Sequence, residues 1–151
     1  MSTFAALLIA GLLGATISIY QPMNGLVSRI TGSPLAANTL FYLVAFLSSA
    51  GMLAVWTLVR PGAPGVTARL LGLPPAQFLA GTMSSVMVLG TIVLLPRLGA
   101  RRLFLLQVAG QVIMALAVGH FGILGTARDP LTLRKALGAA LLLAGAVVSV
   151  L

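Results

Sequence analysis

The chain has 151 residues, of which 60% are hydrophobic and only 7% are charged. Soluble domains carry about a quarter charged residues, and a chain this apolar cannot cover its own surface with polar groups. It is therefore predicted to lie in a lipid bilayer. The absence of cysteine excludes disulfides and thiolate metal sites. The net charge of +8 comes from basic residues scattered between apolar runs, which is typical of groups near lipid headgroups and argues against a nucleic-acid partner.

Five apolar runs follow one another along the chain, at residues 4–26, 35–59, 76–95, 103–121 and 130–151. Each is close to the roughly 20 residues that cross the hydrocarbon of a bilayer as a helix. Their continuous apolarity excludes the alternating strands of a barrel. The basic, Pro/Gly-rich stretch 60–75 is predicted to be the longest aqueous loop. The expected fold is all-α, a single transmembrane domain of residues 1–151 with five helices, whose first run is a retained helix and not a secretory signal.

The basic residues divide almost evenly between the two sides of a five-helix arrangement. The N-terminal side receives Arg60, Arg69, Arg128, Arg134 and Lys135, and the other side receives Arg29, Arg97, Arg101 and Arg102. Orientation normally follows a clear Lys/Arg excess on the cytoplasmic side. The near tie predicts dual topology, in which the same chain inserts both ways. The alternative is one fixed orientation, set by other features or by a sister chain of opposite orientation.

Dual topology predicts that two copies pair head to tail as an antiparallel homodimer. Gly138 and Gly145 lie seven residues apart in the last run. Small residues at such spacing let helix backbones approach closely in lipid, so this pair is a candidate dimer-packing stripe. The alternative is that glycine is simply common in membrane helices.

Polar side chains inside the runs are costly in lipid and usually face the bundle interior or a wet cavity. Gln21 and Asn24 flank Pro22, which removes a backbone donor and frees a carbonyl one turn earlier. They either bind a solute or only repair the kink or mark the helix end. Gln107 and Gln111 share one helix face and either line a pathway or bond helices together. The candidate substrate-binding residues are Gln21, Asn24, Tyr42, Ser85, Gln107 and Gln111.

The inventory of titratable residues argues against an enzyme. Asp129 is the only acid and precedes Pro130, a pair typical of an N-cap followed by the first helical residue. With one acid, one histidine and no cysteine, we expect no catalytic carboxylate pair, no metal site and no cofactor. His120 either carries a coupling proton or is an interfacial residue at a helix C-terminus. Arg101 and Arg102 begin the fourth run, either reaching to the interface or forming an anion-attracting rim.

Three segments carry a family resemblance: YQPMNGLVSRITGSPLAANTLFYLVAFL, LLPRLGARRLFLLQVAGQVIMALAVGHFGILG and LTLRKALGAALLLAGAVVSVL. The chain resembles the DUF606 or YdcZ-like family of the drug/metabolite transporter superfamily, which is distantly related to small multidrug resistance and EamA transporters. The resemblance implies half of a ten-helix transporter, two halves assembled antiparallel, and residence in the bacterial inner membrane. It names no substrate.

The chain departs from the family pattern at two places and differs from the related small multidrug exporters at a third. Gly119 stands where the family often has an acid before its His-Phe-Gly, and Arg101 and Arg102 stand where small or hydroxyl residues are usual. The first run also lacks the glutamate of the small multidrug exporters. Without that counter-charge, a neutral or anionic solute is favoured over a cation.

Together these features predict a small-solute secondary transporter that works by alternating access as an antiparallel dimer. Its partners would be the bilayer, a second copy of itself or a sister chain, and a small molecule. The alternative is a non-transporting accessory or assembly subunit that pairs with a sister chain.

Overall fold

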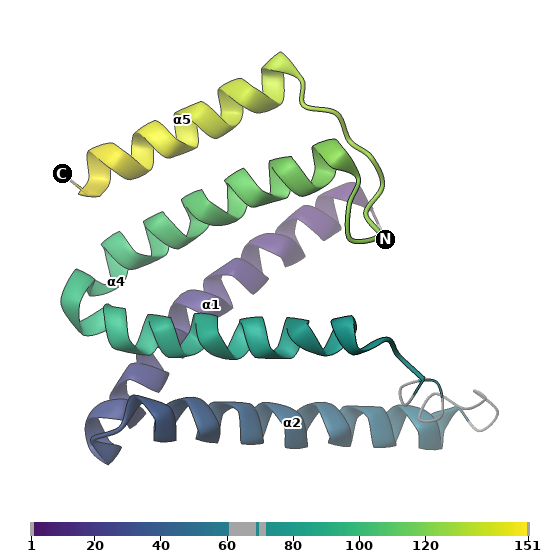
Figure 1. The fold of residues 1–151 in the computed structure, drawn as a ribbon, viewed down its shortest axis with the longest axis vertical. Helices are drawn as coiled ribbons and strands as arrows, with labels where there is room; N and C mark the ends of the chain where they lie inside the picture. The colour runs from purple at the N-terminus through teal and green to yellow at the C-terminus, as the bar shows by residue number, and fades with distance from the viewer. Residues whose placement is uncertain (1, 61–68, 70–71, 151) are drawn as a thin grey trace. The chain divides into compact units, whose positions relative to one another are not determined.

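The computed structural model describes residues 2–60, 69 and 72–150. Within these residues the chain forms α1 (Thr3–Thr31), α2 (Pro34–Val59), a short 3-10 helix η1 (Pro75–Phe78), α4 (Leu79–Phe121) and α5 (Leu133–Val150) (Figure 1). No strand occurs in this part of the chain, so the all-α prediction is confirmed. Most of the predicted loop at 60–75 lies outside the described residues. The chain divides into two compact units, Met1–Pro96 and Arg97–Leu151.

Side-chain and glycine caps define the ends of the first two helices. Ser2 caps α1 by accepting a hydrogen bond from Ala5 N–H at 3.3 Å, and Gly32 ends it with a φ of 68°, a left-handed conformation that glycine adopts without strain. Helix α1 therefore runs past residue 26, where the apolar run ends, and contains Pro22 in its interior. Ser33 caps α2 by accepting from Ala36 N–H at 3.2 Å.

A single glycine interrupts the longest helix. At about 1.5 Å per residue, the 43 residues of α4 would extend about 65 Å, twice the roughly 30 Å thickness of bilayer hydrocarbon. Gly99 breaks the helical backbone with a φ of 74° and a ψ of 158°. Residues other than glycine avoid this conformation because of their Cβ atom. The predicted third and fourth runs lie on either side of this break. The described residues form four α-helices, so the count of five helices is not confirmed.

The last helix begins later than the sequence predicted. Asp129 does not cap it, and that prediction is wrong: residues 123–132 are non-helical and α5 begins at Leu133. Thr132 instead occupies the N-cap position of α5, where its Oγ1 accepts a hydrogen bond from Lys135 N–H at 3.4 Å. Asp129 instead forms an ion pair with Lys135, and its N–H donates to the Gly119 carbonyl at 2.7 Å. This hydrogen bond ties Asp129 to the end of α4.

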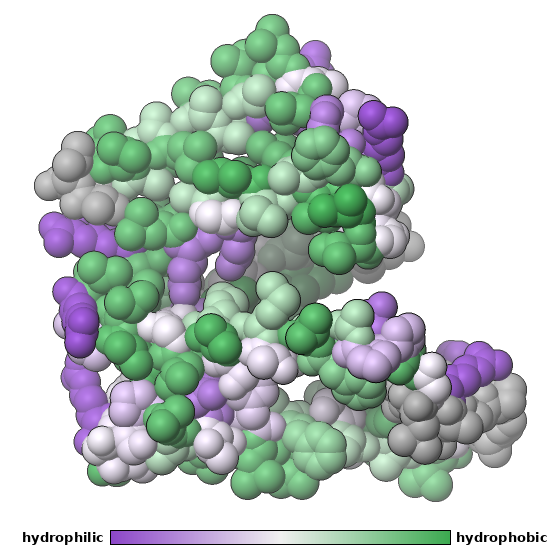
Figure 2. Space-filling model, in the orientation of Figure 1, coloured by the Kyte–Doolittle hydropathy of each residue, from purple (hydrophilic) through white to green (hydrophobic). Residues whose placement is uncertain are grey.

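Apolar side chains point outward along the helices. Leu12, Leu58 and Leu141 are 69%, 78% and 74% exposed, and Figure 2 shows hydrophobic residues over much of the visible face. Among the described residues, three segments are long and apolar enough to cross a membrane, namely Thr3–Thr31, Pro34–Val59 and Pro75–Phe121. In a bilayer this outer surface contacts lipid without the cost of exposing it to water. The core of the first unit is small, centred on Ala37, Val88 and Ile92.

Candidate functional site

Hydroxyl and amide groups join α2 to the first part of α4 in the first unit. Asn38 Nδ2 donates to Ser85 Oγ at 2.8 Å, and the Tyr42 hydroxyl lies 2.6 Å from Ser84 Oγ. Asn38 and Tyr42 are four residues apart and therefore share one face of α2. Hydrogen bonds between helices in lipid contribute about 0.6–2 kcal/mol each. Tyr42 and Ser85, both candidate substrate-binding residues, thus also hold two helices together.

Aromatic rings join α1 to α2 beside this polar group. Tyr20 stacks on Phe41 with ring centroids 5.4 Å apart, and Phe41 meets Tyr42 edge to face at 5.1 Å. Such pairs contribute about 0.5–1.5 kcal/mol beyond the area they bury. Gln21 follows Tyr20 directly, so this packing fixes the part of α1 that carries the predicted amides.

Four buried amide atoms on α1 and α2 have no hydrogen-bond partner within the described part of the chain. They are Gln21 Oε1 and Nε2, Asn24 Nδ2 and Asn38 Oδ1. Gln21 is only 1% exposed and Asn38 8% exposed. An unpaired buried polar group costs about 1–3 kcal/mol, and such groups in folded proteins call for an explanation such as a water, an ion or a ligand. Neither amide atom of Gln21 bonds the carbonyl freed by Pro22.

A groove of about 250 Å³ lies between α1 and α2 and includes Asn24. Its other lining residues are apolar: Met23, Val27, Ala37, Leu40, Phe41, Val44 and Ala45. Gln21 lies one turn before Asn24 on the same face of α1. The groove therefore combines apolar walls with one amide, that of Asn24, and neither Gln21 nor Asn38 is among the residues that line it.

A glycine brings α1 close to α4 within the same unit. Gly25 is buried, and a Cβ built there would lie 3.1 Å from Leu95 Cδ2. The residue next to Asn24 must therefore be small for α1 and this part of α4 to approach each other as they do.

The remaining predicted polar residues lie in the second unit. Gln107 is partly buried and Gln111 is exposed, both on α4. Arg101 and Arg102 are exposed and follow the break at Gly99. None of these four residues lines the groove between α1 and α2, so the substrate-binding and anion-rim roles predicted for them stay predictions.

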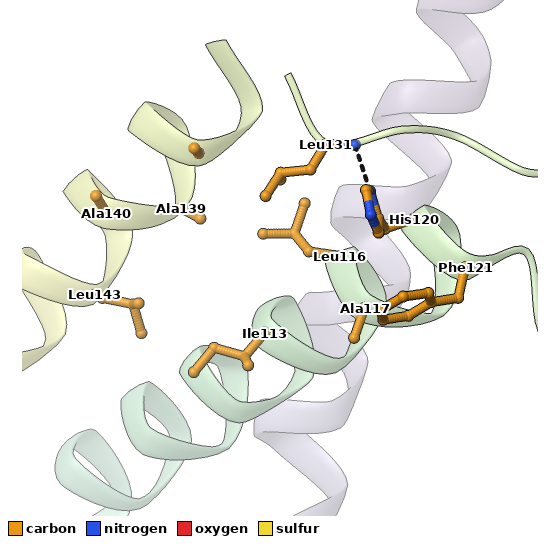
Figure 3. Close-up of a pocket in the computed structure, with 10 residues that line it drawn as sticks. Ile113, Leu116, Ala117, His120, Phe121, Leu131, Ala139, Ala140 and Leu143 are labelled. Atoms are coloured by element: carbon orange, nitrogen blue, oxygen red, sulfur yellow. Dashed lines mark hydrogen bonds between the residues drawn. The ribbon is translucent and has the colours of Figure 1, made fainter. Parts of the chain in front are cut away.

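His120 lies at a second cavity, of about 420 Å³, in the second unit. Figure 3 shows its imidazole beside Leu131, whose N–H donates to His120 Nδ1 at 3.0 Å. Because Nδ1 accepts this bond, the neutral ring carries its proton on Nε2. The other lining residues are apolar, among them Ile113, Leu116 and Leu143. The ring therefore positions the segment that leads into α5, and its predicted proton-carrying role stays untested.

The two glycines of the predicted dimer-packing stripe on α5 are exposed, with no other part of the described chain packed against them. Gly138 and Gly145 are exposed, and a Cβ at either position would meet no atom within 4 Å. Ala146, in contrast, is buried at 4% exposure. Within the described residues, no group of three His, Asp or Glu side chains could hold a metal ion.

The candidate set omitted Asn38 and Ser84, which the structure adds to the polar group. Asn38 stands four residues before Tyr42, and Ser84 stands next to Ser85. Helical spacing from Tyr42 would have identified Asn38, whereas Ser84 is only the sequence neighbour of Ser85, and neighbouring residues do not share a helix face. Which serine faces which α2 side chain depends on how the helices pack, and the sequence does not encode that in any local pattern.

The family model described as "Putative inner membrane exporter, YdcZ" matches residues 5–148 of the chain, almost its whole length. No curated protein and no solved structure matches the chain.

Proposed function

The chain belongs to the YdcZ family and is a multi-pass inner membrane protein of the drug/metabolite transporter type, and on this premise we propose that it exports a small solute by alternating access. The solute would bind at the amide groups of α1 and α2, among Gln21, Asn24 and Asn38. Alternating access places such a site near the bilayer midplane, between helices that rock against one another.

The observation that carries this proposal is the set of unpaired amide atoms beside an apolar groove. Polar groups within membrane helices are expensive and are kept at substrate or ion pathways. A protein that only needed to hold its helices together would pair these atoms, as it pairs Asn38 Nδ2 with Ser85. Atoms left unpaired in the described residues are free to bond a passing solute.

The break at Gly99 supports two membrane crossings within α4. Arg97, Arg101 and Arg102 surround it, and clustered basic residues prefer the aqueous side of a span. Two crossings here, together with α1, α2 and α5, would make five. Five crossings place the termini on opposite sides of the membrane.

Five crossings give nearly equal basic charge on the two sides, which favours insertion in both orientations. Two oppositely oriented copies would reproduce the inverted repeat found in many secondary transporters. The open face at Gly138 and Gly145 offers a surface for a second copy. Substituting isoleucine at both glycines should shift the dimer to monomer in detergent, measured by light scattering. Gly11, which also has open space around it, gives the matched control when changed to isoleucine.

Reporter fusions test the topology directly. A periplasm-active and a cytoplasm-active reporter, each fused to the C-terminus, should both give signal if the chain inserts both ways. Adding two lysines beside Arg102 should then bias the chain to one orientation. Activity of one reporter alone would contradict dual topology. Transport would then have to be carried out by a chain with one fixed orientation, either alone or together with a sister chain.

Transport itself is tested in vesicles. Proteoliposomes loaded with a neutral-metabolite extract should lose at least one solute faster than protein-free vesicles, measured by mass spectrometry. The Asn24→Leu variant should lose this activity, whereas Gln77→Leu, at an exposed residue of η1, should retain it. Equal rates for wild type and Asn24→Leu would remove the groove from the pathway. A requirement for a co-expressed partner chain would favour an accessory role.

A further inference from the structure

We infer that the site on α1 and α2 selects an uncharged solute with adjacent hydrogen-bond donor and acceptor groups on a small apolar body, such as a primary carboxamide, a lactam or a nucleobase edge. The inference rests on the proposed function and names its substrate class. It draws on which amide atoms are unpaired, on the charges of the first unit and on the walls of the groove.

Gln21 fixes the hydrogen-bonding pattern. Its Oε1 and Nε2 are both buried and both unpaired within the described residues, so the side chain presents an acceptor and a donor side by side. Carboxamide side chains pair in two-point fashion with a complementary edge, as Asn and Gln do with adenine. A group with only acceptors, such as a carboxylate, or only donors, such as an ammonium, leaves one atom of Gln21 unpaired.

Two further amides, on α1 and α2, add to this pattern. Asn24 adds an unpaired donor at Nδ2, and Asn38 adds an unpaired acceptor at Oδ1. The four atoms thus comprise two donor groups and two acceptors. This balance suits a solute with both kinds of group and favours neither an anion nor a cation.

The charges of the first unit also favour a neutral solute. Its charged side chains among the described residues are Arg29, Arg60 and Arg69, and all three are exposed. The only acid in the sequence, Asp129, belongs to the second unit. A buried ion without a counter-charge costs several kcal/mol, and no charged residue lines the groove.

The groove sets the size and polarity of the rest of the molecule. Its volume of about 250 Å³ falls below the range of about 300–1,000 Å³ usual for drug-sized ligands. Its walls, including Val27, Phe41 and Val44, are apolar. A single ring or a short branched chain fits this description.

Three one-ring probes test the inference: benzamide, benzoate and benzylammonium, which share the ring and differ in the polar group. Binding to the purified full chain in lipid nanodiscs is measured by isothermal titration calorimetry. Benzamide should bind at least about tenfold more tightly than either ion, given that a two-point hydrogen-bonded pair contributes about 1–3 kcal/mol of discrimination. Binding by benzoate or benzylammonium as tight as by benzamide would overturn the inference.

The Gln21→Met variant tests whether Gln21 does the selecting. Methionine has nearly the same shape without polar atoms, so the variant should lose the benzamide preference and melt at the same or a higher temperature, because two unpaired buried atoms are removed. Gln77→Met is the control and should keep the preference. A lower melting temperature for Gln21→Met would show that Gln21 has a structural bonding role, and would overturn the inference.

Failure here is distinguishable from failure of the proposed function. If benzamide shows no advantage while metabolite efflux still depends on Asn24, the substrate class is wrong and transport stands. If neither the preference nor Asn24-dependent efflux is found, both proposals fall.

Discussion

The hydrogen bonds inside the first unit differ from those inside the second in how far along the sequence they reach. In the first unit the bonds between helices connect residues far apart in sequence, 47 positions for Asn38 and Ser85 and 42 for Tyr42 and Ser84. In the second unit the bond from Leu131 to His120 spans 11 positions and the ion pair of Lys135 with Asp129 spans six. The first unit therefore depends on tertiary packing, whereas the second is organised by local contacts at one turn.

The chemistry of the two units differs in the same way. The groove of the first unit contains an unpaired amide, and its buried neighbour Gln21 is unpaired as well. The larger cavity of the second unit is apolar apart from His120, whose Nδ1 already accepts a bond. The buried side-chain atoms without a partner among the described residues thus belong to the unit with the long-range hydrogen bonds. The first unit is the better candidate for solute recognition.

The largest effect is expected where the first unit buries an uncompensated polar group. Gln21→Glu would place a carboxylate at a position 1% exposed, and burying an unpaired charge costs several kcal/mol. The variant should melt far below wild type in detergent, by circular dichroism, and should not bind benzamide. Gln77→Glu, at an exposed residue, should melt as wild type does. Equal melting of the two variants would show that Gln21 reaches water, and would remove the contrast between the units.

The next effect tests the close packing of the first unit. Gly25→Leu places a side chain where a Cβ alone would lie 3.1 Å from Leu95, and overpacking a core costs about 1–3 kcal/mol. Gly14→Leu is the matched change on the same helix, at a position with open space, and should be neutral or slightly stabilising because leucine favours helix. Thermal unfolding of both variants gives the comparison. A neutral Gly25→Leu would show that α1 does not approach α4 as closely as described.

The sequence predicted the features that arise from composition and local spacing. The long apolar runs indicated membrane helices, and Gln21, Asn24, Tyr42 and Ser85 were chosen as candidates because polar groups are rare in such runs. It did not show that Asp129 pairs with Lys135 and leaves the capping place to Thr132. Asp129 N–H also donates to the Gly119 carbonyl at the end of α4, and the local preference of one residue for an N-cap position does not predict that contact.

Nor could the sequence show which amide atoms stay unpaired. Asn38 donates to Ser85 through Nδ2 while its Oδ1 has no partner among the described residues. The two atoms belong to one side chain, and only the positions of the neighbouring helices decide which is satisfied. The break at Gly99 is an intermediate case: the sequence predicted separate apolar runs before and after it, but the positive φ that separates the two parts of α4 is a property of the backbone conformation.

A moderate effect is expected at the turn of the second unit. His120→Leu removes the acceptor for the Leu131 N–H and should cost about 1 kcal/mol, the usual net value of one hydrogen bond. His120→Asn places a side-chain carbonyl near the position of Nδ1 and should recover part of that loss. Amide hydrogen exchange at Leu131 measures the effect locally, with faster exchange for leucine than for asparagine. Unchanged exchange in both variants would show that the turn does not rely on this bond.

The smallest effect is expected at the ion pair beside that turn. Asp129 and Lys135 side chains are 69% and 34% exposed, and ion pairs open to solvent contribute about 0–1 kcal/mol. Asp129→Asn should therefore change the melting temperature little, and the change should shrink further in high salt because screening weakens exposed charge pairs. Lys135→Met should cost more than Asp129→Asn, since Lys135 Nζ also donates to the Pro130 carbonyl at 3.0 Å. Melting curves at low and high salt distinguish the two contributions. A large, salt-independent loss in Asp129→Asn would place this carboxylate in a dry environment and make the second unit, like the first, depend on buried polar contacts.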